Sequence, residues 1–354
     1  MRTFGGISGA IIGALILTQA KSILTLLDMT ERIRQNRGPS GAFEDTDFSS
    51  MIQAEKGELY FCVDGGGSRS RGRFVDIEGT VFAEAKGGPC NPSTDLERAA
   101  ASVVDVWSHC CSVVGRPNKQ FKGVVFAVGA AGAYIDVGKD FLTACPPFAR
   151  SCLMSDGYAA LIGADFGAPC SLLIIGTGVA GHRLYGNGRS IQRGAWGWIG
   201  GDRGGGSWIG RKALRQCFAA LDGAVPKDAL SRETLRAIGG IEGLRAGWMR
   251  DLGPDRLAAL APLVLEQAVA GDEAARCIRD RAVEHLAALV AVISGPDAPL
   301  FAAGGLVAPL RALLSEKTGL PILEPKADAL TGCRLVATGR APEERALLLP
   351  PDIH

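Results

Sequence analysis

The stretch Asp64-Gly65-Gly66-Gly67-Ser68-Arg69-Ser70 follows an apolar, β-like run at 59–63, and the same pattern returns later in the chain. There, Gly176-Thr177-Gly178 follows an apolar run at 171–175. Glycine lets backbone N–H groups approach an anion closely because no Cβ intervenes, and the neighbouring serine and threonine hydroxyls add donors. Two such loops in one chain predict a duplicated fold that binds a polyphosphate from two sides.

The elements predicted around the two loops repeat in the same order. After the first loop the pattern predicts strands at 71–75 and 81–85, a helix that begins near Leu96, strands at 123–128 and 151–155, and a helix at 158–165. After the second loop it predicts strands at 182–185 and 190–193, helices at 207–221 and 272–293, and a strand at 299–303. Thr94-x-x-Glu97 has the spacing of a capping box for the first helix. This order predicts a duplicated α/β fold with a ligand-binding cleft between its halves.

Composition narrows the class of protein. The chain has 354 residues, 47% of them hydrophobic and 21% charged, which suits a folded protein of two domains. Its net charge of +1 and the absence of a basic cluster argue against a nucleic-acid partner. Ten cysteines without a Cys-x-x-Cys pair are typical of reduced, buried thiols in a cytoplasmic protein. Four scattered histidines indicate no metal site.

The N-terminal segment is expected to stand apart from the catalytic fold. The apolar run at 7–17 is short for a membrane span and only partly resembles a secretory signal, and residues 32–54 are polar. We expect residues 1–56 to be a poorly ordered extension or the product of a misplaced start codon, with Met51 as the alternative start. An enzyme that used ATP as its polyphosphate would lack it outside the cytoplasm, which argues against secretion. A membrane partner is not expected either, because the apolar run is short for a span.

Two aspartates lie where predicted strands end. Asp64 begins the first glycine loop, where its carboxylate can hold Mg²⁺ through water, although Asp-Gly is also a common hairpin turn. Asp156 lies between a strand and a helix, where it suits a general base for a hydroxyl and equally suits a helix N-cap. Arg69 either adds positive charge near the phosphates or points to solvent.

Three further segments are candidates for ligand contacts. The glycine-rich stretch at 194–206 demands an unusual backbone, contains Asp202 as an acceptor for sugar hydroxyls, and leads into a helix whose N-terminus can face an anion. Asn91 can donate to and accept from vicinal hydroxyls, or it simply forms a turn before Pro92. Gly304-Gly305 follows an apolar strand, where an adenine ring can lie against the backbone, although ordinary turns look the same.

Taken in order, these segments resemble the BadF/BadG/BcrA/BcrD-type ATPases, and within them the amino-sugar kinases. The resemblance covers about Glu58 to Ala337. The segments that carry it are Asp64–Ser70 (the family's DGGGTKT loop), Gly88-Pro89-Cys90-Asn91, Ser155-Asp156-Gly157, Gly176-Thr177-Gly178, the run from Trp196-Gly197 through Gly206-Ser207-Trp208-Ile209-Gly210 (GWG…GDEGSG…WIG), and Gly304-Gly305. The resemblance implies a duplicated ribonuclease H-like (actin-like) fold of two domains, with ATP and Mg²⁺ as cofactors.

The resemblance also implies roles and boundaries. It implies ATP-dependent phosphorylation of glucosamine or N-acetylglucosamine at the 6-hydroxyl by Asp156, with a homodimer as one option. ATP contacts are expected from Gly65, Gly66, Gly67, Ser68, Arg69, Gly176, Thr177, Gly178, Gly304 and Gly305, and sugar contacts from Asn91, Asp156, Trp196, Gly197 and Asp202, with Asp64 holding Mg²⁺. The expected domains are 57–166 and 167–340, with a last helix that can return to the first domain and a tail at 341–354.

The sequence departs from the family pattern at three positions. Val179 replaces a common serine, Arg203 replaces a common glutamate, and Ser155 replaces a common asparagine. Two alternatives stay open, of which Val179 and Arg203 motivate the first and other members of the family suggest the second. One is a sugar-binding regulator with impaired catalysis. The other is an ATPase that activates a dehydratase through an iron–sulfur cluster, for which Cys110, Cys111, Cys145 and Cys152 are candidates by number only.

Overall fold

A computed structural model describes residues 58–133, 135–296 and 298–349. The expectations for residues 1–56, including the alternative start at Met51, lie outside this part of the chain. In the part described, no helix combines the length and the apolar character that a membrane crossing needs.

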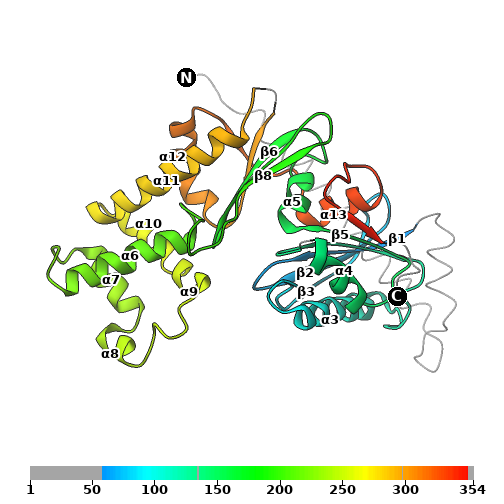
Figure 1. Ribbon diagram of the computed structural model, residues 1–354, viewed down its shortest axis with the longest axis horizontal. Helices are drawn as coiled ribbons and strands as arrows, with labels where there is room; N and C mark the ends of the chain where they lie inside the picture. The colour runs from blue at the N-terminus through cyan, green and yellow to red at the C-terminus, as the bar shows by residue number, and fades with distance from the viewer. Residues whose placement is uncertain (1–57, 134, 297, 350–354) are drawn as a thin grey trace, which may run out of the picture. The chain divides into compact units, whose positions relative to one another are not determined.

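The first sheet has the strand order β11-β5-β4-β1-β2-β3 (Figure 1). Strands β1, β2 and β3 form an antiparallel meander, β4 and β5 run parallel to β1, and β11 pairs antiparallel with β5. Helix α3 (Leu96–Val114) packs against β2 and β3, and α4 (Ile135–Ala144) packs against α3. The strand bounds are β1 Leu59–Gly65, β2 Ser70–Val75, β3 Val81–Gly87, β4 Val124–Ala130, β5 Arg150–Ser155 and β11 Leu347–Leu349.

The second sheet repeats this topology with the order β10-β9-β6-β7-β8. Strands β6, β7 and β8 form the meander, while β9 and β10 run parallel to β6. The order β10-β9-β6-β7-β8 matches β5-β4-β1-β2-β3, and only β11 has no counterpart among the described strands, so the predicted duplication of an α/β fold is confirmed. The bounds are β6 Cys170–Ile175, β7 Val179–Leu184, β8 Ser190–Gly194, β9 Leu300–Ala303 and β10 Ile322–Leu323.

A group of helices accompanies the second sheet (Figure 1). Helix α11 packs on β6, β7 and β8, and it also contacts α6, α10 and α12. The helices of this group are α6 Gly206–Leu221, α7 Ala229–Ala237, α8 Gly240–Arg245, α9 Pro254–Ala258, α10 Ala261–Val269, α11 Glu273–Ile293 and α12 Val307–Thr318. Helices α6 and α11 confirm the helices predicted at 207–221 and 272–293, whereas α7 to α10 and α12 were not predicted from the sequence.

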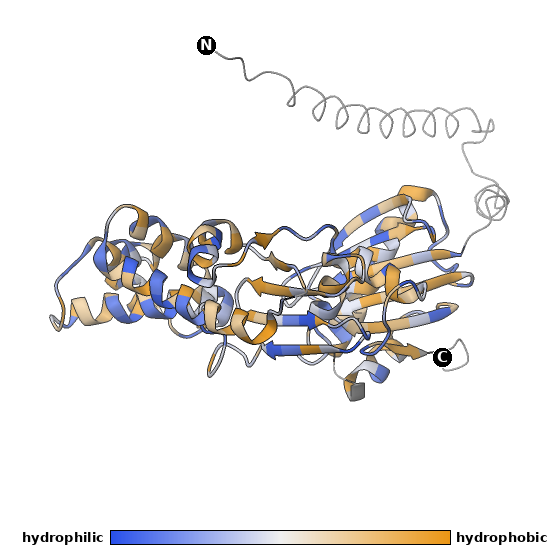
Figure 2. Cartoon of the chain, turned by 90° about the horizontal axis from the view of Figure 1, so that it is seen from above, coloured by the Kyte–Doolittle hydropathy of each residue, from blue (hydrophilic) through white to orange (hydrophobic). Residues whose placement is uncertain are grey.

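One apolar core joins the second sheet to the helices that accompany it, and another, around α5 and α13, contains residues of both sheets. Much of the length of the strands is coloured apolar in Figure 2. Between the first sheet and α3, Phe61 packs with ring centroids 5.2–5.9 Å from Phe74, Trp107, Phe126 and Phe148. Helix α3 begins one residue later than the capping box predicted. The N-cap is Asp95, which accepts from the Arg98 N–H, because the Asn91 side chain already accepts from the Thr94 N–H.

Helices α5 (Asp156–Ala164) and α13 (Ala329–Ala337) cross at backbone distance. A Cβ on Gly332 would lie 1.9 Å from the carbonyl oxygen of Ala159, and a Cβ on Gly163 would lie 2.2 Å from that of Asp328. Only glycine permits this approach at either position. The crossing therefore holds the helix that begins with Asp156 against the C-terminal part of the chain.

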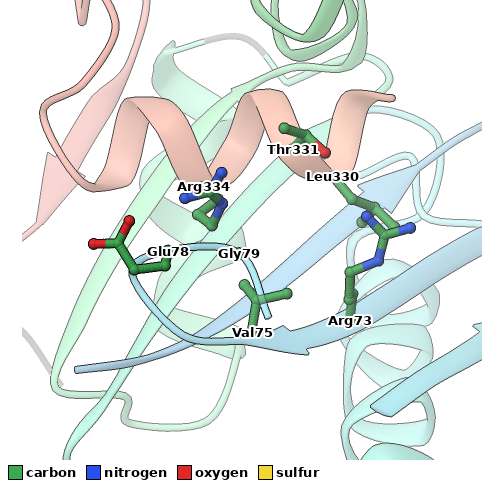
Figure 3. A pocket seen from close by; sticks show the side chains of 7 residues that line it. All are labelled: Arg73, Val75, Glu78, Gly79, Leu330, Thr331 and Arg334. Carbon is green, nitrogen blue, oxygen red and sulfur yellow. The ribbon is translucent and has the colours of Figure 1, made fainter. Parts of the chain in front are cut away.

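Charged side chains also fix α13 on the first sheet. Asp328 caps α13 and pairs with Arg73 on β2 at 3.1 Å, and Arg334 Nη1 donates to the carbonyl of Ile77 at 2.5 Å. Figure 3 shows Arg334 reaching from α13 toward the turn that carries Glu78 and Gly79. The C-terminal residues thus belong structurally to the first sheet, while the domain boundaries at 166 and 340 stay predictions.

Candidate functional site

The carboxyl ends of three parallel strands bring Asp64 and Asp156 to one edge of the first sheet. Asp64 pairs in register with Gly129 on β4, and Asp156 directly follows β5 on the other side of β4. Two strand spacings separate the two positions, which amounts to about 10 Å. Ligands of open α/β sheets bind at such edges.

Asp156 is the first residue of α5, and it is not the cap. Ser155 is the N-cap and its hydroxyl accepts from the Tyr158 N–H at 3.1 Å, so the alternative reading of Asp156 as a cap is wrong. Asp156 Oδ1 accepts from the Gly157 N–H at 2.8 Å. Burial raises the pKa of Asp156 above its usual value, and the nearby Asp64 charge raises it further. A carboxylate with a raised pKa and one oriented oxygen is suited to accept a proton.

Asp64 has a cationic neighbour that sequence reasoning missed. Arg71 Nη2 lies 2.8 Å from Asp64 Oδ2, and Arg71 Nη1 lies 3.7 Å from Asp328 Oδ2. Asp64 and Arg71 face each other across the β1–β2 hairpin, where opposite charges stabilise each other. The hairpin register was the signal that could have identified this pair, because the two residues flank the first glycine loop almost symmetrically.

The first glycine loop, residues 65–69, is held by its carbonyl groups. Gly65 O accepts from the Ala131 N–H at 2.7 Å and Gly66 O from the Cys90 N–H at 2.9 Å, while the Gly66 N–H donates to Arg69 O within the loop. The N–H groups of Gly67 and Ser68 donate to no acceptor among the described residues. Arg69 is exposed. The loop thus presents two N–H donors, while the carbonyls of Gly65, Gly66 and Arg69 already accept hydrogen bonds.

The second glycine loop is anchored to helix α6. Gly176 O and Thr177 O accept from the Gly206 and Ser207 N–H groups at 2.8 and 2.9 Å. The first two N–H groups of α6 are therefore not available to an anion, because the loop carbonyls already use them. The Thr177 N–H donates to no acceptor among the described residues, which leaves it directed to a ligand or to water.

Asp202 lies against the second glycine loop. Its Oδ1 accepts from the Val179 N–H at 3.3 Å, and a Cβ on Gly178 would lie 2.6 Å from its Oδ2. The residue has φ +51°, and burial raises its pKa. The Val179 side chain is buried in the apolar core between the second sheet and its helices, and Arg203 is exposed. The structure thus places Asp202 beside a predicted phosphate loop, and its contact with a sugar stays a prediction.

The hydroxyls of both loops converge on one carboxylate. Ser68 Oγ donates to Asp255 Oδ2 at 3.1 Å, and Thr177 Oγ1 donates to Asp255 Oδ1 at 3.2 Å. A carboxylate spans little more than 2 Å between its oxygens, so the two hydroxyls lie close together. Sequence reasoning missed Asp255, which no motif singles out.

The adenosine segment follows β9, the parallel neighbour of β6. Gly304 has φ +106°, and a Cβ there would lie 2.3 Å from the carbonyl oxygen of Ile175, the last residue of β6. A Cβ on Gly305 would meet nothing within 4 Å. Gly304 is thus required by the close turn, whereas Gly305 leaves an open backbone surface beside the second loop.

Two of the remaining predicted sugar contacts, Asn91 and Trp196, differ in how much of the side chain is free to bind a ligand. Asn91 Oδ1 accepts from the N–H groups of Ser93 and Thr94 at 3.1 and 3.3 Å, so its oxygen forms the turn and only its amide N–H groups are left to donate to a sugar. Trp196 is 84% exposed on the glycine-rich stretch, between Ala195 at φ +56° and Gly197 at φ +81°. An indole so exposed is available to a ligand.

The four candidate cysteines are not placed to hold an iron–sulfur cluster at the surface of the protein. Cys110, Cys111, Cys145 and Cys152 are all buried, and burial raises the pKa of Cys110 and Cys152 to about 12. Buried thiols with raised pKa values are poor ligands, because metals bind the thiolate. No group of three or more potential metal-binding side chains occurs in the described part of the chain. The four cysteines therefore give the activator alternative no support.

Comparisons with known proteins point to one family. A model of the BadF/BadG/BcrA/BcrD ATPase family matches residues 62–313. Glucosamine kinase GspK of Vibrio cholerae is 26% identical over 280 residues, which cover 78% of this chain and 95% of that protein. An N-acetylmuramic acid/N-acetylglucosamine kinase of Clostridium acetobutylicum is 25% identical over 178 residues, or 49% of this chain and 58% of that protein.

A solved structure agrees with these relatives. A candidate N-acetylglucosamine kinase of Chromobacterium violaceum superimposes with a TM-score of 0.73 at 30% identity, covering 79% of this chain and 99% of that chain. The similarity extends over nearly the whole of that protein, so it concerns the complete two-sheet fold.

Proposed function

Because this chain belongs to the BadF/BadG/BcrA/BcrD ATPase family, we propose that it is an ATP-dependent kinase that phosphorylates glucosamine or N-acetylglucosamine at the 6-hydroxyl. The relatives that carry these names support an amino sugar as acceptor. One observation carries the proposal: the hydroxyls of both glycine loops, Ser68 and Thr177, meet within the reach of one carboxylate. The first of these loops directly follows Asp64, on the sheet edge that also holds Asp156.

Asp156 acts as the general base in this proposal. Its raised pKa lets it accept the proton of the sugar hydroxyl as that oxygen attacks phosphorus. The Gly157 N–H holds Oδ1, so Oδ2 is the oxygen that takes the proton. Phosphoryl transfer depends mainly on positioning and charge neutralisation, so one base at the sheet edge is sufficient.

The two loops and Asp64 bind the nucleotide. The N–H groups of Gly67, Ser68 and Thr177 have no acceptor among the described residues, which fits phosphate oxygens. Arg71 pairs with Oδ2 of Asp64, so Oδ1 is the oxygen of this side chain that would hold Mg²⁺ through water. Mg²⁺, when bound, neutralises charge on the phosphates. Gly304 and Gly305 offer the backbone surface for adenosine.

A panel of sugars tests the proposed function. With ATP and Mg²⁺, we expect ADP release with glucosamine or N-acetylglucosamine and much slower release with sugars that lack a nitrogen at carbon 2. The full chain is assayed by coupled ADP detection. Sugar binding without ADP release would instead support the impaired regulator, for which Val179 and Arg203 are the motivating departures.

Trp196 offers a direct test of the sugar side. We expect amino-sugar binding to change the tryptophan fluorescence of the protein, because an exposed indole that contacts a ligand loses water. In W196F this change should disappear, and KM for the sugar should rise about tenfold while kcat changes less. W198F is the matched control, because Trp198 is partly buried against the cluster around Leu214. A full fluorescence change in W196F would remove Trp196 from the sugar site.

A further inference from the structure

Asp255 is placed rigidly although it lies on a five-residue helix. Helix α9 packs on α6, where a Cβ on Gly210 would lie 1.8 Å from the carbonyl oxygen of Leu257 and one on Gly206 would lie 2.9 Å from the Cβ of Ala258. Helix α6 in turn donates its first N–H groups to the carbonyls of the second glycine loop. The loop, α6 and α9 therefore form one connected unit that holds the Asp255 carboxylate at the loop.

The carboxylate of Asp255 has hydroxyl partners and no nearby cation. In the described residues, no lysine or arginine nitrogen lies within 4 Å of it, and the neighbouring Arg256 instead lies 3.8 Å from Asp251. Its contacts are the Ser68 and Thr177 hydroxyls. These hydroxyls belong to the two loops whose backbone N–H groups the proposed function assigns to phosphate oxygens. The Asp255 oxygens thus accept hydrogen bonds from hydroxyls that could otherwise donate to phosphate oxygens.

We propose that Asp255 makes nucleotide binding depend on an accompanying divalent cation, an inference that rests on the proposed kinase function. A bare nucleoside triphosphate would bring its negative charge against the Asp255 carboxylate, and close like charges oppose binding. A nucleotide that arrives with Mg²⁺ carries less negative charge, and its cation attracts the carboxylate. Asp255 therefore selects the metal–nucleotide complex over the free nucleotide, and without nucleotide it keeps the two loops together through their hydroxyls.

The test measures nucleotide binding, not turnover. The dissociation constants of ADP and of a non-hydrolysable ATP analogue are measured by isothermal titration calorimetry, with Mg²⁺ and with a chelator, on the full chain and on D255N. In the chelator, D255N should bind the analogue about tenfold more tightly than the wild-type protein. With Mg²⁺ the two proteins should bind the analogue about equally tightly, or D255N should bind it more weakly. The ratio of the two constants, without and with Mg²⁺, therefore shrinks about tenfold in the variant.

A matched control separates this effect from net charge. Asp251 lies four residues earlier, its side chain is 83% exposed, and it contacts neither loop. D251N should keep the wild-type ratio, while unchanged or weaker binding of the metal-free analogue by D255N would overturn the proposal. If the wild-type protein binds neither nucleotide under either condition, the kinase function itself fails together with this inference. Asp255 is exposed, so D255N should fold, and its thermal unfolding is compared with that of wild type.

Discussion

Replacing Asp156 with asparagine is expected to lower kcat about a thousandfold while nucleotide affinity stays within about twofold of wild type. Asparagine keeps the size of the side chain and the acceptor for the Gly157 N–H, but it cannot take a proton from the sugar hydroxyl. Steady-state kinetics give kcat, and titration with ADP gives the affinity. D140N is the control, because Asp140 is an exposed carboxylate of α4.

The pH dependence should follow the same residue. The pKa of Asp156 is raised, so kcat of the wild-type protein should increase as pH rises through that raised pKa and fall below it, where the carboxyl is neutral and cannot accept a proton. The residual activity of D156N should lack this limb of the profile. Turnover of D156N within tenfold of wild type would assign the base to another residue.

Replacing Gly332 with alanine is expected to destabilise the protein by about 3 kcal/mol. In an unobstructed helix this change stabilises by up to about 1 kcal/mol, because alanine is the better helix former. Here the added Cβ would lie 1.9 Å from the carbonyl oxygen of Ala159, and backbone atoms of a packed helix cannot move aside. The steric effect should therefore reverse the sign that propensity alone predicts.

Urea denaturation followed by circular dichroism measures this change in the free energy of unfolding. G186A is the control, because a Cβ there would lie 3.8 Å from its nearest neighbour, Pro169, and its stability should change by less than about 0.5 kcal/mol. G332A should also lose activity, because α13 supports the helix that carries Asp156. A G332A protein as stable as wild type would show that the α5–α13 crossing is looser than described.

Much of the architecture could be predicted from local patterns. The two meanders and their glycine loops were identified because period-two runs and glycine turns depend on neighbouring residues only. The positions of Asp64 and Asp156 at the ends of predicted strands were visible in the sequence, but their shared edge required the parallel pairing of β1, β4 and β5. The short helices α7 to α10 escaped prediction, because helices of this length are stabilised by tertiary packing and carry little periodicity of their own.

The partners of the site residues could not be predicted in the same way. Ser68 and Asp255 are 187 residues apart, and Thr177 and Asp255 are 78 apart, so no sequence spacing indicates their contact. The choice of Ser155 over Asp156 as N-cap was also open, since both residue types cap helices well. Arg71 lies only seven residues after Asp64 in the sequence, but the pairing of the two side chains became clear only from the register of the β1–β2 hairpin.

The amino-acid sequence by itself determined the strand–loop units, their duplication and the chemical groups at the strand ends, because backbone propensity and side-chain alternation act over a few residues. Only the tertiary structure decided that α13 returns to the first sheet, that α6 takes the carbonyls of the second loop, and that Asp255 joins the hydroxyls of both loops. Such contacts join segments distant in the chain, and they form only where burial of the whole core brings those segments together.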